Sequence, residues 1–273
     1  QELDNPLFYT NVGLGEVTYW ANGWFPIHDQ YRENFEPGAT VAGTVIKGGA
    51  LQGYLVDKAG ADLYGITTLG DFKTNAAARS AYDSDGNGKA NLVGCPEGWG
   101  CKNVIGHHLD DLGLRDSIDE GTAGYSPAMA DAIARFNNDE HVLFYTWTPN
   151  WTVSVLAPGK EVVWIGIPES SHPDGALSEA DLTASGINGA TTDPILFGFA
   201  ASDIQVVANQ EFLDDNPAAK KLFEVMRFTL GDIADQNNKM NDGENSDTDI
   251  EKHVTDWIAA NQSTWDGWIS QAK

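Results

Sequence analysis

Residues 95–101 read Cys-Pro-Glu-Gly-Trp-Gly-Cys, and this stretch contains the only two cysteines of the chain. Apolar residues at helical spacing follow it, from Val104 and Ile105 to Leu114. This order predicts a loop that is closed by a disulfide and leads directly into the N-terminus of a helix.

The chemistry of this loop suits a small ligand that carries both charges. Backbone N–H groups at a helix N-terminus bind anions, and the ring face of Trp99 attracts a cation. The loop therefore offers both halves of a site for a zwitterion. The residues leave a second interpretation open, in which the loop is a disulfide-closed surface turn with Trp99 packed inward.

Two cysteines separated by five residues make neither a four-ligand zinc site nor a CxxC redox centre. A disulfide between Cys95 and Cys101, formed in an oxidising compartment, is the best remaining interpretation. Because the closed loop is short, the bond would stabilise the fold by only about 2 kcal/mol in the chain-entropy model. We therefore expect its main effect to be on the shape of the loop.

Length and composition predict a folded protein with a substantial core. The chain has 273 residues, enough for two lobes or one large domain, and 41% of them are hydrophobic. No run approaches the roughly 20 apolar residues of a membrane-spanning helix. The opening residues, Gln1 to Asp4, lack the basic and apolar regions of a signal peptide, so we expect a chain from which such a peptide has been removed.

The net charge of −24 and a pI near 4.3 exclude two classes of partner. Nucleic acid requires clustered Lys and Arg on the protein surface, and anionic lipid attracts basic segments. We expect neither as a partner of this chain, and we expect the charge to favour solubility.

Aromatic residues gather where three expected strands end. Trp24 and His28 lie in a loop flanked by Gly and Pro, Trp147 follows a short apolar strand, and Trp99 lies in the cysteine loop. Because expected strands alternate with helices, the fold class is α/β, and ligands of such folds bind in a crevice at one edge of the sheet. Considered alone, Trp24 and His28 also fit a packed loop with a capping histidine.

The other elements follow from periodicity and turn residues. Residues 1–20 are expected to begin as a polar, irregular segment. Strands are expected at 41–56 with an interruption at Gly48-Gly49, and at 142–145, 162–168 and 204–208. Helices are expected at 57–69, 71–81, 126–136 with Ser126 as N-cap, 216–230 and 247–258, with a long irregular excursion at 169–194.

The segment from Asp83 to Leu92 resembles the first half of a calcium loop, because Asp83, Asp85 and Asn87 place oxygens at alternate positions. A complete EF-hand is excluded, since Gly94 stands where the closing glutamate belongs. We expect an Asp- and Gly-rich turn, with a weak Ca²⁺ site as the alternative. No other metal and no cofactor is expected.

Catalytic signatures are missing from the sequence. It contains no G-x-S-x-G elbow, HExxH, P-loop or GxGxxG motif, and no carboxylate pair stands out from the general acidity. These motifs therefore indicate no catalytic centre.

Segments spread over nearly the whole chain resemble the ProX family, the substrate-binding proteins of ProU-type ABC transporters for glycine betaine and proline betaine. The segments that carry the resemblance are 22–29, 49–55, 83–101, 144–149, 216–220 and the region of Gln236, Met240 and Asp242-Gly243. The combination of the Gly-Trp-Gly-Cys loop with Thr-Trp-Thr-Pro downstream is specific.

The resemblance implies a two-lobed periplasmic-binding-protein fold of type II, with the ligand in the cleft between the lobes. Lobe I would combine residues 1–56 with 204–273, and lobe II would span 57–203. The family has a further strand and helix ahead of the Trp24 segment, and we expect this chain to lack them.

The resemblance also implies the binding residues. Trp24, Trp99 and Trp147 would box the quaternary ammonium, and His28 with the backbone of Gly100 and Cys101 would hold the carboxylate. It implies a membrane permease as partner, a periplasmic or extracytoplasmic location and a monomer.

General physical chemistry is compatible with these roles. A trimethylammonium group has no proton to donate, so its site must offer ring faces, and three cation–π contacts contribute about 6 kcal/mol. Charge-assisted hydrogen bonds to the carboxylate add about 1.5–3 kcal/mol each. After the costs of ordering and desolvation, a micromolar dissociation constant is expected.

Two functional hypotheses follow from the sequence. The first is a transport receptor for betaine-type osmolytes, and the second is an extracellular carbohydrate-binding or glycan-active protein, since nine tryptophans and an acidic surface also suit sugars. Hydrolysis of a glycan would need two placed carboxylates.

Overall fold

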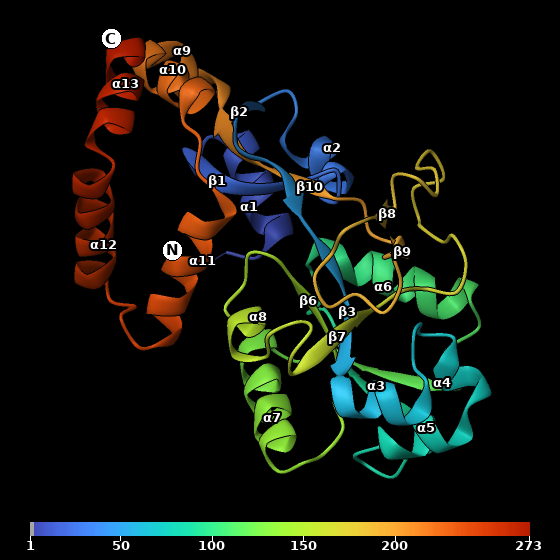
Figure 1. Ribbon diagram of the computed structural model, residues 1–273. Coiled ribbons are helices and arrows are strands. Elements are labelled where there is room, and N and C mark those ends of the chain that lie inside the picture. Colours follow the sequence, from blue (N-terminus) through green and yellow to red (C-terminus); the bar gives the residue numbers. More distant parts are fainter. Residues whose placement is uncertain (1–2) are drawn as a thin grey trace. The chain divides into compact units, whose positions relative to one another are not determined.

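The computed structural model describes residues 3–273 and divides the chain into two α/β units. Unit 1 holds the described residues up to Ala50 together with Thr148–Trp151 and Ser202–Lys273. Unit 2 holds Leu51–Trp147 and Thr152–Ala201. Figure 1 shows the elements of both units along the chain.

Unit 1 is built on a three-stranded antiparallel sheet in the order β1-β10-β2. The strands are β1 (Tyr19–Phe25), β10 (Ser202–Asn209) and β2 (Ala39–Ala50). Because β10 is the central strand, the sheet joins the beginning of the chain to its last quarter.

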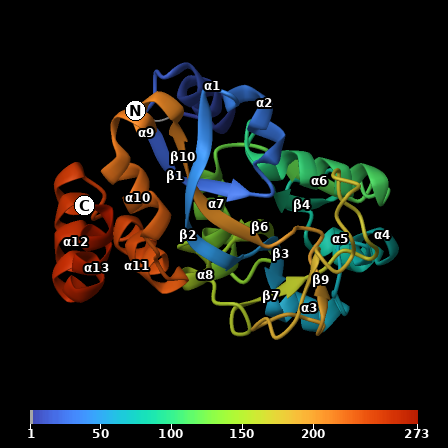
Figure 2. The same ribbon diagram turned by 90° about the horizontal axis from the view of Figure 1, so that it is seen from above.

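The two faces of this sheet are covered by different helices, as the alternation of side chains along β1 requires. Trp20 packs against Phe8 of α1 (Asn5–Leu14), and Tyr19 on the other face contacts Phe223 of α10 (Pro217–Val225). Figure 2 shows α1 beside α2 (Arg32–Phe35), which follows the short 3₁₀ helix Asp29–Tyr31. The buried cluster beneath α1 consists of Phe8, Tyr9, Val12, Phe25, Tyr31, Phe35, Ala39 and Val207.

The expectation of an irregular opening segment is wrong, because α1 is a regular helix. The Asp4 carboxylate accepts a hydrogen bond from the Leu7 N–H at 2.9 Å, Pro6 lies in the first turn, and Gly15 ends the helix at a φ of 80°. These start and stop signals are local, but the helix gains its stability from burying Tyr9 and its neighbours against the sheet.

Helices dominate the end of unit 1. They are α9 (Gln210–Asp215), α10, α11 (Leu230–Asn241), α12 (Asp247–Ala260) and α13 (Gln262–Ala272), and α13 lies beside α10. Thr229 and Ser246 form capping boxes at the starts of α11 and α12. The helix expected at 216–230 ends at Val225, because Met226 has an extended backbone.

Trp257 stacks on Trp268 with ring centroids 5.6 Å apart, and Phe228 contacts both rings. Trp268 is therefore a core residue. In the part of the chain that the structure covers, no helix has both the length and the apolar character needed to cross a membrane.

Unit 2 is built on a mixed five-stranded sheet in the order β5-β4-β6-β3-β7. β4 runs parallel to β5 and β6, whereas β3 is antiparallel to β6 and β7. The strands are β3 (Gln52–Asp57), β4 (Ala90–Val93), β5 (Ile118–Gly121), β6 (Leu143–Trp147) and β7 (Val162–Ile165).

The helices of unit 2 are α3 (Lys58–Tyr64), α4 (Asp71–Thr74), α5 (Ala76–Ala81), α6 (Gly100–Asp111), α7 (Tyr125–Asn137) and α8 (Thr152–Val155). The excursion expected at 169–194 contains the strand β8 (Thr183–Ala184), which pairs with β9 (Ile195–Leu196). α7 begins at Tyr125, and its N-cap is Gly124 rather than the expected Ser126, two residues further along the chain.

The expected strand 41–56 is two strands, and its break lies at Leu51 rather than at Gly48-Gly49. Both glycines have positive φ values inside β2, which keeps its pairing with β10 up to Ala50. Because β3 pairs with β6 and β7, its residues belong to unit 2, whereas we expected them in lobe I.

The contact between β2 and α10 depends on a glycine. A Cβ atom at Gly43 would lie 2.0 Å from the carbonyl oxygen of Phe223, which is backbone and cannot rotate away. We expect Gly43→Ala to lower the free energy of unfolding by about 1–3 kcal/mol, measured by urea denaturation.

Gly231→Ala is the matched control, because the nearest atom to its added Cβ is the Thr229 hydroxyl at 3.5 Å. Alanine also favours the helix, so this variant should be as stable as the parent or slightly more stable. Equal stability of the two variants would show that β2 and α10 do not approach as closely as described.

Candidate functional site

Two tryptophans meet at one edge of the unit 2 sheet. Trp147 is the last residue of β6, and Trp99 lies in the loop between β4 and α6. Their ring centroids are 5.5 Å apart and their planes are inclined by 71°. Both side chains are partly exposed, so the nearly perpendicular rings form adjacent aromatic walls.

The loop that carries Trp99 is closed by the expected disulfide between Cys95 and Cys101, whose Cα atoms are 5.9 Å apart. Trp99 is the N-cap of α6, and Gly100 and Cys101 are the first two helical residues. Their N–H groups therefore belong to the first turn, where the helix dipole favours a negative charge. One short segment thus presents an aromatic wall next to an anion-attracting helix end.

A buried ion pair anchors this loop from below. The Glu120 carboxylate on β5 is 2% exposed and accepts a hydrogen bond from Lys102 Nζ on α6 at 2.7 Å. A Cβ atom at Gly94 would lie 2.4 Å from Glu120 Cγ, so the start of the loop rests directly on this side chain. We did not identify Glu120 from the sequence, since only the pairing of β4 with β5 brings it to the loop.

Tyr125 is a further residue that we did not identify. Its ring centroid is 4.8 Å from that of Trp147 and 6.1 Å from that of Trp99. Its hydroxyl is within hydrogen-bond distance of Tyr145 O at 3.0 Å and of Thr146 Oγ1 at 2.8 Å, and burial raises its pKa. The sequence signal was an aromatic residue directly before the helix expected at 126–136.

In unit 1, Trp24 and His28 lie together at the end of β1. Trp24 is 9% exposed, and its Nε1–H donates to Asn22 Oδ1 at 2.8 Å. The His28 N–H donates to Trp24 O at 2.7 Å, and the Trp24 N–H donates to His28 Nδ1 at 3.0 Å. This reciprocal pair of hydrogen bonds fixes the two residues relative to each other.

His28 is a neutral imidazole. It is 6% exposed, and burial lowers its pKa to about 3, because a charged ring would lose its hydration there. The Tyr9 hydroxyl lies 2.7 Å from Nδ1, and the Asn5 carboxamide lies 3.3 Å from Nε2. Both Asn5 and Tyr9 come from α1, which the sequence interpretation did not predict.

A second histidine, His108 on α6, is fully buried in unit 2. Tyr54 Oη lies 2.7 Å from its Nδ1, while its Nε2 faces the carbonyl oxygens of Ser171 at 3.0 Å and Gly198 at 3.2 Å. Burial lowers the pKa of His108 to about 4. Both ring nitrogens are occupied by protein groups, which makes it a structural residue.

The structure thus brings the expected binding residues together in two sets. Trp24 and His28 form one set within unit 1. Trp99, Gly100, Cys101 and Trp147 form the other within unit 2.

The Asp83 segment is a turn stabilised from within. The Asp83 carboxylate accepts hydrogen bonds from the N–H groups of Gly86, Asn87 and Gly88, and these bonds lower its pKa, that from Gly88 most. Among residues 3–273, no three His, Cys, Asp or Glu side chains are grouped as a metal centre requires. The carboxylate oxygens of Asp83 accept hydrogen bonds from backbone N–H groups, which agrees with the interpretation of this segment as a turn.

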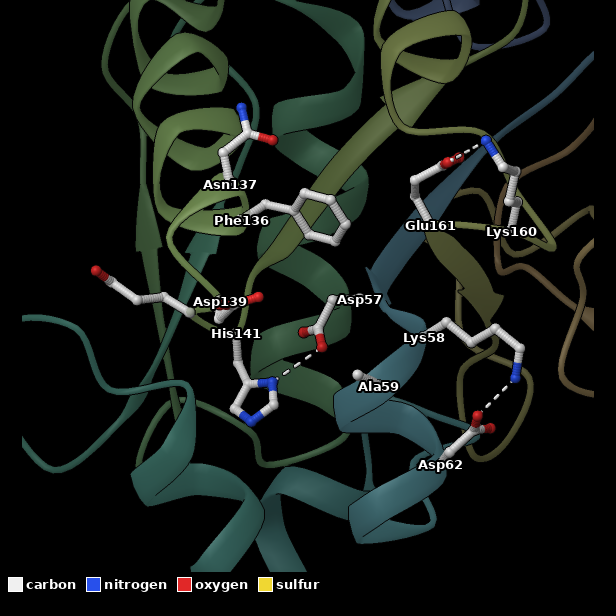
Figure 3. A pocket seen from close by; sticks show the side chains of 11 residues that line it. Asp57, Lys58, Ala59, Asp62, Phe136, Asn137, Asp139, His141, Lys160 and Glu161 are labelled. Atoms are coloured by element: carbon white, nitrogen blue, oxygen red, sulfur yellow. Dashed lines mark hydrogen bonds and ion pairs between the residues drawn. The ribbon is translucent and has the colours of Figure 1, made fainter.

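A pocket of about 660 Å³ opens at the C-terminal end of β3, whose last residue is Asp57 (Figure 3). Asp57 accepts hydrogen bonds from His141 Nδ1 at 2.9 Å and from the N–H groups of Gly60 and Val142. Phe136 is the one phenyl ring among the described residues that line the pocket. Lys58 forms an ion pair with Asp62, and Lys160 forms one with Glu161. The pocket offers a single phenyl ring face and several of its charged groups are paired with one another, so we do not assign the ligand to this pocket.

Comparison with protein families gives a match over almost the whole chain. Residues 1–260 match the OpuAC family, described as the substrate-binding domain of ABC-type glycine betaine transport systems.

Two curated relatives are similar along the full chain. The glycine betaine-binding periplasmic protein OusX of Dickeya dadantii (strain 3937) is 39% identical over 273 residues, which cover 100% of this chain and 80% of that protein. The glycine betaine/proline betaine-binding periplasmic protein of Salmonella typhimurium is 39% identical over 272 residues, with coverage of 99% and 80%.

Solved structures share the fold. A ProX protein from Borrelia burgdorferi has a TM-score of 0.70 at 15% identity, with coverage of 100% of this chain and 87% of that one. An ABC-transporter choline-binding protein in complex with choline gives 0.70 at 15%, with coverage of 99% and 80%. These similarities confirm the predicted fold class, the α/β fold of two-lobed periplasmic binding proteins.

The buried histidines predict how stability depends on pH. An unfolded histidine has a pKa near 6.5, so below that pH the unfolded state binds protons that the folded His28 and His108 do not. Their contribution to stability is present above pH 6.5 and is lost as the pH falls towards 4. His108→Gln removes one such group.

We expect the free energy of unfolding of the parent to fall more steeply between pH 6.5 and 4 than that of His108→Gln, by about 1.4 kcal/mol per pH unit. Urea titrations at several pH values measure both slopes, and comparing the variants cancels the contribution of the carboxylates. Parallel pH profiles would show that His108 is protonated in the folded protein.

Proposed function

The chain belongs to the family of substrate-binding domains of ABC-type glycine betaine transport systems, and we propose that it captures glycine betaine and proline betaine for delivery to a membrane permease. It acts by binding and release and catalyses no reaction. The location we propose is periplasmic or otherwise extracytoplasmic, reached through a signal peptide, and the receptor is a monomer.

One local arrangement carries the proposal. In unit 2 the rings of Trp99 and Trp147 stand at 71° next to the first turn of α6. A quaternary ammonium group has no N–H to donate and is attracted to ring faces. A carboxylate is attracted to the N–H groups of a helix start. A betaine carries both groups a few atoms apart, so its chemistry matches this arrangement.

We propose that Trp24 supplies the third ring and that His28 supplies a further donor to the carboxylate. The ligand then lies in the cleft between the lobes, and the lobes close on it. Gly100 and Cys101 contribute their backbone N–H groups. This assignment is supported by family membership and by the chemistry of each residue.

The neutral state of His28 suits this role. A neutral imidazole has one N–H to donate, and it remains neutral throughout the physiological range because burial lowers its pKa to about 3. Binding then does not depend on a proton taken up by His28, so affinity should be constant across ordinary changes in external pH.

The carbohydrate hypothesis is the weaker one. The relatives described above are receptors for betaines or choline, and the unit 2 rings meet at a steep angle, whereas a sugar ring stacks on a flat aromatic platform. We therefore retain the transport receptor as the proposed function.

A neutral analogue tests whether the tryptophans recognise charge. The carbon isostere of glycine betaine, 3,3-dimethylbutanoate, keeps the volume and the carboxylate but has no positive charge. It loses the electrostatic part of the cation–π contacts, so its affinity should be at least about 100-fold lower, which corresponds to roughly 2.7 kcal/mol. Calorimetric titration of both ligands measures this ratio.

Trp147→Ala should bring the two affinities closer together, because it removes one of the ring faces. Trp265→Ala, in α13, is the control and should leave the ratio unchanged even if it lowers stability. Equal affinities of the parent for the charged and neutral ligands would mean that the rings form an ordinary hydrophobic pocket, and the betaine assignment would fail.

A further inference from the structure

The hydrogen bonds around His28 determine which ring nitrogen carries its proton. The Trp24 backbone N–H can only donate, and it points at Nδ1 at 3.0 Å. Nδ1 must therefore be the unprotonated nitrogen. Because the ring is neutral, its single proton lies on Nε2.

The Tyr9 hydroxyl contacts the same nitrogen, 2.7 Å away. An unprotonated Nδ1 has nothing to donate, so the hydroxyl must be the donor. Tyr9 is fully buried, and its ring stacks on Tyr31 with centroids 5.0 Å apart and planes inclined by 14°. This packing holds the hydroxyl in place. Two donors thus converge on Nδ1 and exclude a proton from it.

The same pairing of a tyrosine hydroxyl with a histidine Nδ1 occurs in unit 2, but there the other ring nitrogen has different partners. Tyr54 Oη lies 2.7 Å from His108 Nδ1, but the Nε2–H of His108 is taken up by two backbone carbonyl oxygens. His28 Nε2 faces no carbonyl in the part of the chain that is described. Its neighbour is Asn5 Nδ2, 3.3 Å away at the start of α1. Because an amide nitrogen cannot accept a proton, a protonated Nε2 requires the carboxamide to be turned so that Oδ1 faces it.

This difference in the partner of Nε2 distinguishes His108, a structural histidine, from His28, whose Nε2 is available to a ligand. The Asn5 carboxamide can rotate so that its oxygen accepts the Nε2 proton, and as a side chain it can give way to a stronger acceptor. A ligand carboxylate is such an acceptor, because hydrogen bonds to a charged group are shorter and stronger. A backbone carbonyl, as at His108, has no such freedom.

We propose that Tyr9 is a positioning residue of the ligand site: together with the Trp24 N–H it holds His28 as the tautomer that donates from Nε2 to the carboxylate. The inference rests on the proposed function, since it assigns to His28 the carboxylate of a betaine. If Tyr9 lost its hydroxyl, Nδ1 would keep one donor instead of two, and the preference for this tautomer would weaken.

The tautomer can be observed directly in the parent protein without any ligand. Long-range ¹H–¹⁵N correlation spectra of ¹⁵N-histidine-labelled protein distinguish a protonated ring nitrogen from an unprotonated one, and His28→Gln identifies the His28 signals. We expect a single neutral form between pH 5 and 8, protonated at Nε2. A proton on Nδ1, or a charged ring in this range, would overturn the proposal.

Tyr9→Phe tests the hydroxyl alone, because the phenyl ring keeps its contacts with Tyr31 and Phe35. Affinity for glycine betaine should fall about tenfold, the effect of one weakened hydrogen bond to a charged group. Affinity for choline, which has no carboxylate, should change less than about twofold. The His28 spectrum should show a second tautomer.

Tyr54→Phe is the matched control, since it removes the same hydroxyl-to-Nδ1 contact from His108. It should leave both affinities at the parent values, whatever it does to stability. If Tyr9→Phe matches Tyr54→Phe in both affinities, or weakens choline as much as glycine betaine, Tyr9 has only a structural role.

The outcomes also separate this inference from the proposed function. A parent protein that binds neither betaine refutes the proposed function. A parent that binds glycine betaine but shows no selective loss in Tyr9→Phe refutes only the role of Tyr9.

Discussion

The parallel pairing of β4 with β6 is the constraint on which the proposed ligand site of unit 2 depends. Parallel neighbours end at the same edge of a sheet, so the loop after β4 and the last residue of β6 emerge together. Leu92 lies opposite Leu143. Cys95 follows two residues after the end of β4, and Trp147 is the last residue of β6. Because of this register, the rings of Trp99 and Trp147 lie next to the start of α6. The disulfide fixes the shape of the loop that carries Trp99.

Buried polar groups that are paired within the protein support both sets of proposed binding residues. Lys102 neutralises the buried Glu120 next to the disulfide-closed loop 95–101, where an unpaired carboxylate would lower stability. In unit 1 the hydrogen bonds to His28 Nδ1 determine which ring nitrogen is unprotonated. The other nitrogen, Nε2, faces the side chain of Asn5. Because these side chains are already held in place, ordering them costs little free energy when a ligand binds.

Local patterns in the sequence predicted the features that depend on few residues. The cysteine pair, the aromatic strand ends, the α/β class and the helices expected at 216–230 and 247–258 are signals of this kind, and the structure contains them with shifted ends. Contacts between distant segments could not be predicted in the same way. Glu120 reaches Lys102 through strand pairing, and Asn5 and Tyr9 reach His28 through the packing of α1 on the sheet. The helix itself was missed because its signals are confined to Asp4, Pro6 and Gly15, in a segment with weak apolar periodicity.

The central claim is that this protein is a receptor for betaine-type zwitterions, and a thermal-shift screen tests it most directly. Ligands that bind only the folded state raise the melting temperature in proportion to the logarithm of their concentration over the dissociation constant. The screen compares glycine betaine, proline betaine, choline and a set of oligosaccharides at equal concentrations. We expect the two betaines to raise the melting temperature and the oligosaccharides to leave it unchanged. A rise with oligosaccharides alone would contradict the account.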